Sequence, residues 1–165
     1  MKMETAYFAG GCFWCITPTF QEMQGVTQVL SGYCGGREVD PTYEDVKNQR
    51  TGHRETIHIE FDAELVGFAK LMEVFLSGVD PFDGGGQFID RGHSYTLAVY
   101  YCSEEQKLAA SKAIGDLEKE SGREVCISLE PFDRFYMAEE YHQDFHKKNP
   151  DKFRQELIES GRIKL

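Results

Sequence analysis

The chain has 165 residues, a length typical of one domain. Hydrophobic residues make up 41% and charged residues 28%, which excludes a largely disordered chain and a coiled-coil or collagen-like rod. Its 18 basic and 28 acidic residues give a formal charge of −10, which argues against binding to the phosphates of duplex nucleic acid. No apolar run approaches the roughly 20 residues of a membrane span. No signal-peptide core follows Met1, so we expect a cytoplasmic protein.

The pattern of apolar residues predicts interspersed strands and helices. Strands are expected at residues 5–9, 26–33, 56–61, 96–101 and 125–129. Helices are expected before Gly25, after a cap at Asp62, and from a capping box at Ser103 to a stop at Gly122. Because the strand after residue 55 alternates apolar and polar side chains, the sequence indicates an α+β domain with a mixed or antiparallel sheet.

Two features interrupt this outline. Pro18 lies inside the first helical segment, where a proline costs about 3 kcal/mol, so the regular helix either begins near residues 15–17 or is kinked there. The stretches 34–55 and 78–95 lack periodicity. Because loops this long are usually functional, we expect site residues in both.

Five cysteines lie at positions 12, 15, 34, 102 and 126. The number is odd and the chain is long enough to bury a core, so we expect a reducing compartment and no disulfide framework. A close cysteine pair is then more often catalytic or metal-binding, and Cys12 and Cys15 form such a pair. Cys102 and Cys126 fall at strand positions, where we expect buried, inert thiols.

The run Gly10-Gly11-Cys12-Phe13-Trp14-Cys15 follows an expected strand and opens a helix. The glycines permit a sharp turn that leaves Cys12 accessible, and a thiol at a helix start has a lowered pKa. Cys15 follows three positions later on the same face, which suits a nucleophile with a resolving partner. The neighbouring rings offer an aromatic wall for an apolar substrate group such as a methyl on sulfur.

Two other interpretations of the cysteine pair remain. A zinc site needs four ligands, but no second CxxC or CxxH occurs in the chain, so no metal is expected. The two thiols would otherwise be buried and inert. Thiol chemistry is favoured over both.

Five ordered segments resemble the peptide methionine sulfoxide reductase A family, beginning with the signature Gly11-Cys12-Phe13-Trp14. The others include Gly25-Val26 with Ser31-Gly32-Tyr33-Cys34-Gly35-Gly36, Pro41-Thr42-Tyr43-Glu44-Asp45-Val46 with Thr51-Gly52-His53-Arg54-Glu55, Asp80-Pro81 with Gln87, Asp90-Arg91-Gly92 and Tyr95, and Ala138-Glu139-Glu140-Tyr141-His142-Gln143 with Lys148-Asn149-Pro150.

This resemblance implies an enzyme that reduces the S epimer of methionine sulfoxide, free or in proteins, to methionine. It also implies an α+β domain with a ferredoxin-like sandwich core. By position, it makes Cys12 the nucleophile and Glu55 the acid that protonates the sulfoxide oxygen. The implied substrate-binding residues are aromatic or acidic: Phe13, Trp14, Tyr43, Asp90 and Tyr95.

The chemistry itself needs such a set of groups. Sulfoxide oxygen leaves only when it is protonated, yet a carboxyl in water has a pKa near ~4.3 and is ionised at pH 7. Partial burial beside aromatic rings would raise the pKa and keep the proton available. Attack at sulfur leaves a sulfenic acid on the nucleophile, which a second thiol converts to a disulfide.

The chain departs from the family at its resolving cysteines. Lys47 stands where many members have one, and no cysteine follows Cys126. We therefore expect Cys15 to resolve the sulfenic acid of Cys12, with Cys34 as the second candidate. Thr17 replaces an acidic residue common in the family, for which we expect only a local structural effect.

Partners follow from this reaction. The expected substrates are oxidised proteins or free methionine sulfoxide, and the expected reductant is thioredoxin or glutaredoxin, with no cofactor, nucleic acid or membrane partner. The alternative is a general CxxC thiol–disulfide oxidoreductase, which would not need Glu55 or Tyr43. We expect one catalytic domain, 1–165, with a charged tail, 132–165, that packs on it and is partly helical at 138–148.

Overall fold

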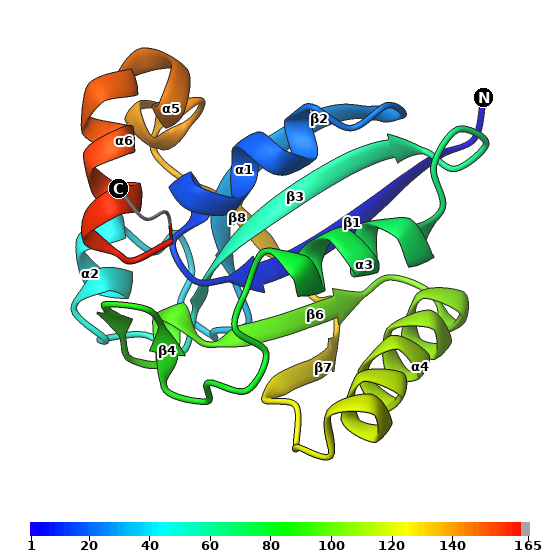
Figure 1. Ribbon diagram of the computed structural model, residues 1–165. Helices are drawn as coiled ribbons and strands as arrows, with labels where there is room; N and C mark the ends of the chain where they lie inside the picture. The colour runs from blue at the N-terminus through cyan, green and yellow to red at the C-terminus, as the bar shows by residue number, and fades with distance from the viewer. Residues whose placement is uncertain (163–165) are drawn as a thin grey trace.

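The computed structural model describes residues 1–162, which form a six-stranded sheet in the order β7-β6-β1-β3-β2-β8 with helices packed on it (Figure 1). The sheet strands are β1 (Met3–Gly10), β2 (Val26–Cys34), β3 (Arg54–Asp62), β6 (Leu97–Tyr101), β7 (Ile127–Pro131) and β8 (Phe135–Met137). The helices are α1 (Phe13–Gln21), α2 (Tyr43–Lys47), α3 (Phe68–Ser77), α4 (Glu104–Ser121), α5 (Phe145–Lys148) and α6 (Pro150–Glu159). Short elements complete the chain: β4 (Gly86–Gln87), β5 (Asp90–Arg91) and the 3-10 helices η1 (His93–Tyr95) and η2 (Glu140–His142).

The sheet is mixed. β3 pairs antiparallel with both β1 and β2, β1 pairs antiparallel with β6, and β8 extends the far edge antiparallel to β2. Only β6 and β7 run parallel, across the connection that contains α4. The expected α+β class is confirmed.

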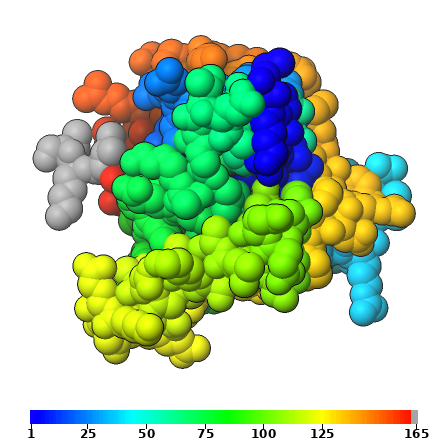
Figure 2. Space-filling view, turned by 90° about the vertical axis from the view of Figure 1, so that its right-hand side faces the viewer, coloured from blue at the N-terminus to red at the C-terminus, as the bar shows by residue number. Residues whose placement is uncertain are grey.

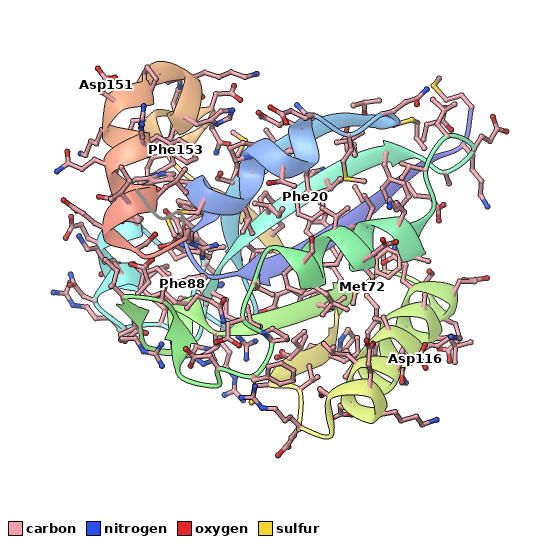
Figure 3. All side chains as sticks on the ribbon, in the orientation of Figure 1. Phe20, Met72, Phe88, Asp116, Asp151 and Phe153 are labelled. Carbon is pink, nitrogen blue, oxygen red and sulfur yellow. The ribbon has the colours of Figure 1, made fainter. Side chains whose placement is uncertain are left out.

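Alternation along the central strands separates two apolar clusters. Phe8 on β1 and Ile57 on β3 face the helices, where Phe20 of α1 and Met72 of α3 fill the space above the sheet (Figure 3). Tyr7 faces the opposite side, in a smaller cluster that the chain segment after β7 covers. Because successive side chains of a strand point to opposite faces, this register decides which β3 residues can reach the helix side.

The predicted N-cap of α4 is present, but the Gln106 side chain reaches back one residue further than in a capping box. The Ser103 hydroxyl accepts a hydrogen bond from Gln106 N at 3.2 Å, and Gln106 Oε1 accepts one from Cys102 N at 2.9 Å. Gly122 ends the helix with φ 70°, a left-handed conformation that favours glycine. In Figure 2, α4 forms a ridge across one end of the molecule.

One expectation about helices was wrong, one of two alternatives is excluded, and one helix was not predicted. Asp62 does not cap α3. Its carboxylate instead accepts hydrogen bonds from Lys2 N and Glu64 N and closes a turn. Regular helix begins at Phe13 rather than near residues 15–17, and it continues through Pro18. The tail contains α6 beyond the predicted helical region, because Pro150 suits the first turn of a new helix.

The tail returns to the beginning of the helical layer. β8 adds to the edge of the sheet, and α5 and α6 contact α1, on the side of the molecule where β1 ends (Figure 1). The last three residues of the predicted tail, 163–165, lie outside the described residues. None of the helices in residues 1–162 combines the length and apolar character needed to cross a bilayer.

Replacing Ser103 by Ala removes the hydroxyl that caps α4. We expect the free energy of unfolding to fall by about 1 kcal/mol, measured by urea denaturation. Ser111→Ala, which removes a hydroxyl from an exposed position on the same helix, is the control and should cost nothing. Equal losses in the two variants would contradict the capping role.

Candidate active site

Cys12 lies in a tight turn between β1 and α1. It occupies the position before the helix, with an extended backbone at φ −60° and ψ 119°. Gly11 has φ 86°, and a Cβ there would lie 2.8 Å from Cβ of Gln87, so the glycine also lets the loop of residues 78–95 approach the turn. Cys12 is only 9% exposed, less than the sequence predicted.

Glu55 is the acidic residue that β3 points into the helix layer. It shares a strand face with Ile57, and it is 1% exposed. Its Oε1 accepts a hydrogen bond from Phe13 N at 3.2 Å, whereas Oε2 has no partner within residues 1–162. Burial, followed by the charge of Asp90, raises the pKa of Glu55 to about 8, although the Phe13 bond opposes the rise. The carboxyl is therefore mostly protonated at neutral pH.

Tyr43, Asp90 and Tyr95 surround the same point. Burial, followed by the charges of Glu55, Tyr43, Asp90 and Cys12, raises the pKa of Tyr95. Burial and the charge of Glu55 likewise raise the pKa of Tyr43, so both phenols keep their protons and can donate hydrogen bonds. Burial also raises the pKa of Asp90. The structure thus gathers residues that are 83 positions apart in sequence, from Cys12 to Tyr95.

An aromatic wall stands beside this cluster. Trp14 stacks on Phe145 of α5 with ring centroids 3.9 Å apart and planes 8° apart. Its Nε1 donates a hydrogen bond to Nδ1 of His142 at 3.0 Å, and the His142 ring lies 4.2 Å from that of Tyr43. Burial lowers the pKa of His142 to about 4, so the imidazole stays neutral and accepts the indole bond.

The tail contributes a second anchor through Glu139. One carboxylate oxygen accepts from the hydroxyl of Tyr33 at 2.8 Å, and the other accepts from Tyr43 N at 3.0 Å. Sequence reasoning assigned no site role to His142, Glu139 or Phe145. Two of them lie in the tail segment that resembles the family, which is the signal that was available.

The ionisation of the two thiols at the turn differs from our prediction. A hydrogen bond with Cys15, then burial, then nearby negative charges raise the pKa of Cys12. The same hydrogen bond and the positive charge of Arg162 lower the pKa of Cys15, against burial. The expectation that the helix start makes Cys12 the thiolate was therefore wrong. Cys12 is enclosed with acidic groups, whereas Cys15 faces a cation.

The remaining cysteines lie away from this cluster. Cys34 belongs to the cluster on the opposite face of the sheet, and its Sγ donates to the carbonyl of Arg134 at 3.1 Å. Cys126 is partly buried, but Cys102 is exposed, which corrects the expectation that both are buried, because it follows the end of β6. All five cysteines are free thiols. Residues 1–162 contain no cluster of three potential metal ligands.

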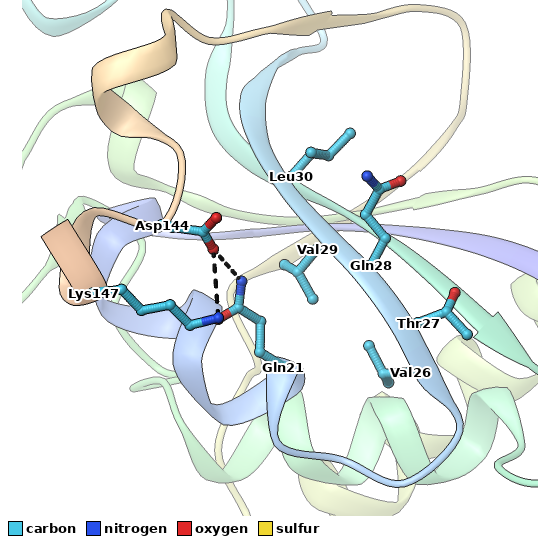
Figure 4. Close-up of a pocket in the computed structure, with 8 residues that line it drawn as sticks. All are labelled: Gln21, Val26, Thr27, Gln28, Val29, Leu30, Asp144 and Lys147. Atoms are coloured by element: carbon cyan, nitrogen blue, oxygen red, sulfur yellow. Dashed lines mark hydrogen bonds and ion pairs between the residues drawn. The ribbon is translucent and has the colours of Figure 1, made fainter.

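A separate hollow lies between the end of α1 and β2 (Figure 4). Gln21 Nε2 donates to Asp144 Oδ1 at 2.8 Å there, and Lys147 Nζ lies 4.0 Å from the same oxygen. The hollow contains neither a thiol nor a buried acid, so it offers no chemistry comparable with that at Cys12.

Comparisons with known proteins agree with this arrangement. A family model described as peptide methionine sulfoxide reductase matches residues 4–165. The peptide methionine sulfoxide reductase MsrA of Bacillus velezensis is 46% identical over 164 residues, which cover 98% of this chain and 92% of the relative. That of Streptococcus agalactiae is 44% identical over 153 residues, which cover 92% and 90%.

Solved structures show the same fold. Methionine sulfoxide reductase A of Corynebacterium diphtheriae has a TM-score of 0.82 at 28% identity, covering 90% of this chain and 76% of that one. Reduced Mxr1 of Saccharomyces cerevisiae has a TM-score of 0.86 at 24% identity, covering 91% and 87%. Since the family model spans almost the whole length and the bacterial relatives align from end to end, the chain belongs to the peptide methionine sulfoxide reductase family.

Proposed function

We propose that this chain reduces methionine S-sulfoxide, free or in proteins, to methionine with electrons from thiols. One observation carries the proposal: a thiol at the start of a helix and a carboxyl that keeps its proton at neutral pH meet in one buried cluster. Cys12 supplies the sulfur, and the raised pKa of Glu55 keeps its proton available. Both the family model and the names of the relatives support this activity.

In the first step, the sulfur of Cys12 attacks the sulfoxide sulfur while Glu55 protonates the sulfoxide oxygen. Cys12 loses its proton as it attacks, and its hydrogen-bond partner Cys15 is placed to receive that proton. The S–S bond formed in this attack then breaks as the protonated oxygen passes from the substrate sulfur to the Cys12 sulfur, so that Cys12 becomes a sulfenic acid and the substrate leaves as a thioether. Cys12 is oxidised by two electrons, and the methionine sulfur is reduced by two.

The surrounding groups bind the substrate by its two chemically distinct parts. The phenols of Tyr43 and Tyr95, whose pKa values are raised, donate hydrogen bonds to the oxygen as charge develops on it. Phe13 and Trp14 offer apolar surface for the methyl group on sulfur. Asp90 positions the substrate and the emerging sulfenic acid.

In the second step, Cys15 attacks the sulfur of the Cys12 sulfenic acid. The S–S bond forms, the S–O bond breaks, and the hydroxyl leaves as water with one proton. Cys34 is the weaker candidate, because it faces the other side of the sheet. An external dithiol then opens the disulfide, and we propose thioredoxin or glutaredoxin. A structure of Mxr1 in complex with Trx2 is among those with a similar fold, at a TM-score of 0.59.

The architecture and compartment complete the proposal. The order β6-β1-β3-β2, with α1 and α3 on one face, supports a ferredoxin-like sandwich core extended by β7 and β8. We propose that residues 1–165 act as one catalytic domain with the tail, 132–165, packed on it. Five free thiols favour a reducing compartment such as the cytoplasm.

Cys12→Ser should abolish turnover of methionine S-sulfoxide with a dithiol reductant, because serine is a far poorer nucleophile toward sulfur. Methionine formation by chromatography is the measurement. Cys102→Ser, which removes an exposed thiol, should retain full activity. Full turnover by Cys12→Ser would overturn the proposed reaction.

Glu55→Gln should remove the acid while keeping the acceptor for Phe13 N. The wild-type rate of the first step should fall as pH rises through about 8, where Glu55 loses its proton, and the variant should be slow at every pH.

The stability of the fold provides an independent check of the raised pKa of Glu55. Because the folded chain retains a proton that the unfolded chain loses near 4.5, wild type should lose stability relative to Glu55→Gln between pH 4.5 and 8.

Urea unfolding at pH 5 and pH 9 measures this difference, which should reach a few kcal/mol. Glu60→Gln alters a carboxyl on the same strand whose side chain is 42% exposed, and it should change neither quantity. A Glu55→Gln variant with the wild-type pH profile would refute the role of the acid.

Mass spectrometry after one turnover without reductant should find a bond between Cys12 and Cys15. In Cys15→Ser the sulfenic acid should persist and react with dimedone, whereas Cys34→Ser should behave as wild type. A bond between Cys12 and Cys34 would move the resolving role to Cys34 and leave the first step untouched.

A further inference from the structure

A cavity opens beside Cys15, and the tail forms one wall of it. α1 contributes Cys15 and Pro18, the chain after α3 contributes Val79, and the loop that carries the substrate residues contributes Phe88. Opposite them stand Leu157 of α6 and Arg162. Figure 3 shows Phe153 of α6 and Phe88 on the same side of the molecule. Arg162 is the charged residue among those that line this cavity with Cys15.

Arg162 is held in place by neutral groups. Its Nη1 donates to the carbonyl of Gly78 and its Nη2 to that of Gly10, each at 3.4 Å, and its guanidinium lies 4.6 Å from the ring centre of Phe88. The Nε–H is buried and has no acceptor among residues 1–162. No carboxylate within that part of the chain forms an ion pair with it. Its charge also acts on Asp90, whose pKa it lowers against the effect of burial. The guanidinium therefore has fixed anchors and one unused donor.

The groups around Cys15 indicate how Arg162 affects the ionisation of its thiol. Cys12 donates a hydrogen bond to Cys15, while the acidic groups of Asp90 and Glu156 oppose its ionisation. Burial opposes it as well. Arg162 is the positive charge that favours the thiolate. Once Cys12 is oxidised to a sulfenic acid, its thiol no longer supports Cys15, and the contribution of Arg162 then remains.

We propose that Arg162 is a positioning residue that keeps Cys15 in the thiolate form for attack on the Cys12 sulfenic acid. The inference rests on the proposed function, because it needs Cys15 to be the resolving thiol. In this step the thiolate forms the S–S bond, the S–O bond breaks, and the departing hydroxide takes one proton from the cluster to leave as water. The sulfenic sulfur is reduced and the thiolate sulfur is oxidised, so no further oxidant or reductant is required.

The ionisation of Cys15 can be measured directly in the Cys12→Ser background. The rate of alkylation by iodoacetamide as a function of pH reports the midpoint of the Cys15 thiol. Adding Arg162→Gln should raise that midpoint by about one unit, an about tenfold loss of thiolate near neutral pH. Arg162→Lys should recover much of the difference. Arg154→Gln, on an exposed position of α6, should leave the midpoint unchanged.

The second step is measured in the otherwise wild-type chain without reductant. Trapping with dimedone at timed intervals follows the decay of the sulfenic acid after one turnover. In Arg162→Gln this decay should be severalfold slower at pH 7 and should return to the wild-type rate at a pH above the shifted midpoint. A burst of one methionine per chain and an unchanged melting temperature show that the variant is folded.

Recovery of the decay rate at high pH distinguishes an electrostatic role of Arg162 from a structural one, because a purely structural role would leave the decay slow at every pH. An unchanged alkylation midpoint, or slow decay without recovery at high pH, would overturn the role of Arg162. Wild-type decay in Cys15→Ser would remove Cys15 from the second step and overturn the proposal with it. In that case the methionine burst would still report the first step, and the alkylation midpoint would still report the ionisation of Cys15, so neither of these results would be affected.

Discussion

The arrangement of the site depends on one carboxyl group buried between the central strand β3 and the first turn of α1. Glu55 reaches the helix layer because it shares a strand face with the apolar residues of β3. Its bond to Phe13 N ties that strand to the helix immediately after Cys12. An ionised carboxylate in this position would be costly, so the group keeps its proton and becomes an acid at neutral pH. The burial that makes an ionised Glu55 costly also keeps the carboxyl protonated, which allows it to act as an acid.

The thiols of Cys12 and Cys15 lie in opposite electrostatic surroundings. The hydrogen bond with Cys15, burial and the nearby charges of Glu55 and Asp90 raise the pKa of Cys12, whereas the hydrogen bond with Cys12 and the charge of Arg162 lower the pKa of Cys15. A single turn of helix therefore presents one sulfur to the substrate side and another to the tail side. This separation suits the proposed successive roles, in which Cys12 first attacks the sulfoxide sulfur and Cys15 then attacks the sulfenic acid on Cys12.

The tail completes the site from more than a hundred residues away in sequence. His142 and Phe145 orient the indole of Trp14, and Glu139 fastens both Tyr33 and the start of α2. The chain segments between the main strands supply Tyr43, Asp90 and Tyr95, and hydrogen bonds anchor these segments. Gln87 illustrates this, since its side chain bonds the backbone of Asp80 through both its oxygen and its nitrogen, and it lies against Gly11.

The sequence by itself determined the alternation of β3 and the N-cap of α4, because these depend on spacing and local hydrogen bonding. The resemblance to the family implied the roles of Glu55, Tyr43, Asp90 and Tyr95. The sequence pattern missed α6 and misplaced the start of α3, because a helix of marginal local signal is decided by what it packs against. Only the tertiary structure decided which thiol is ionised and where Arg162 lies. A pKa reflects burial and every charge nearby, and those neighbours come from distant parts of the chain.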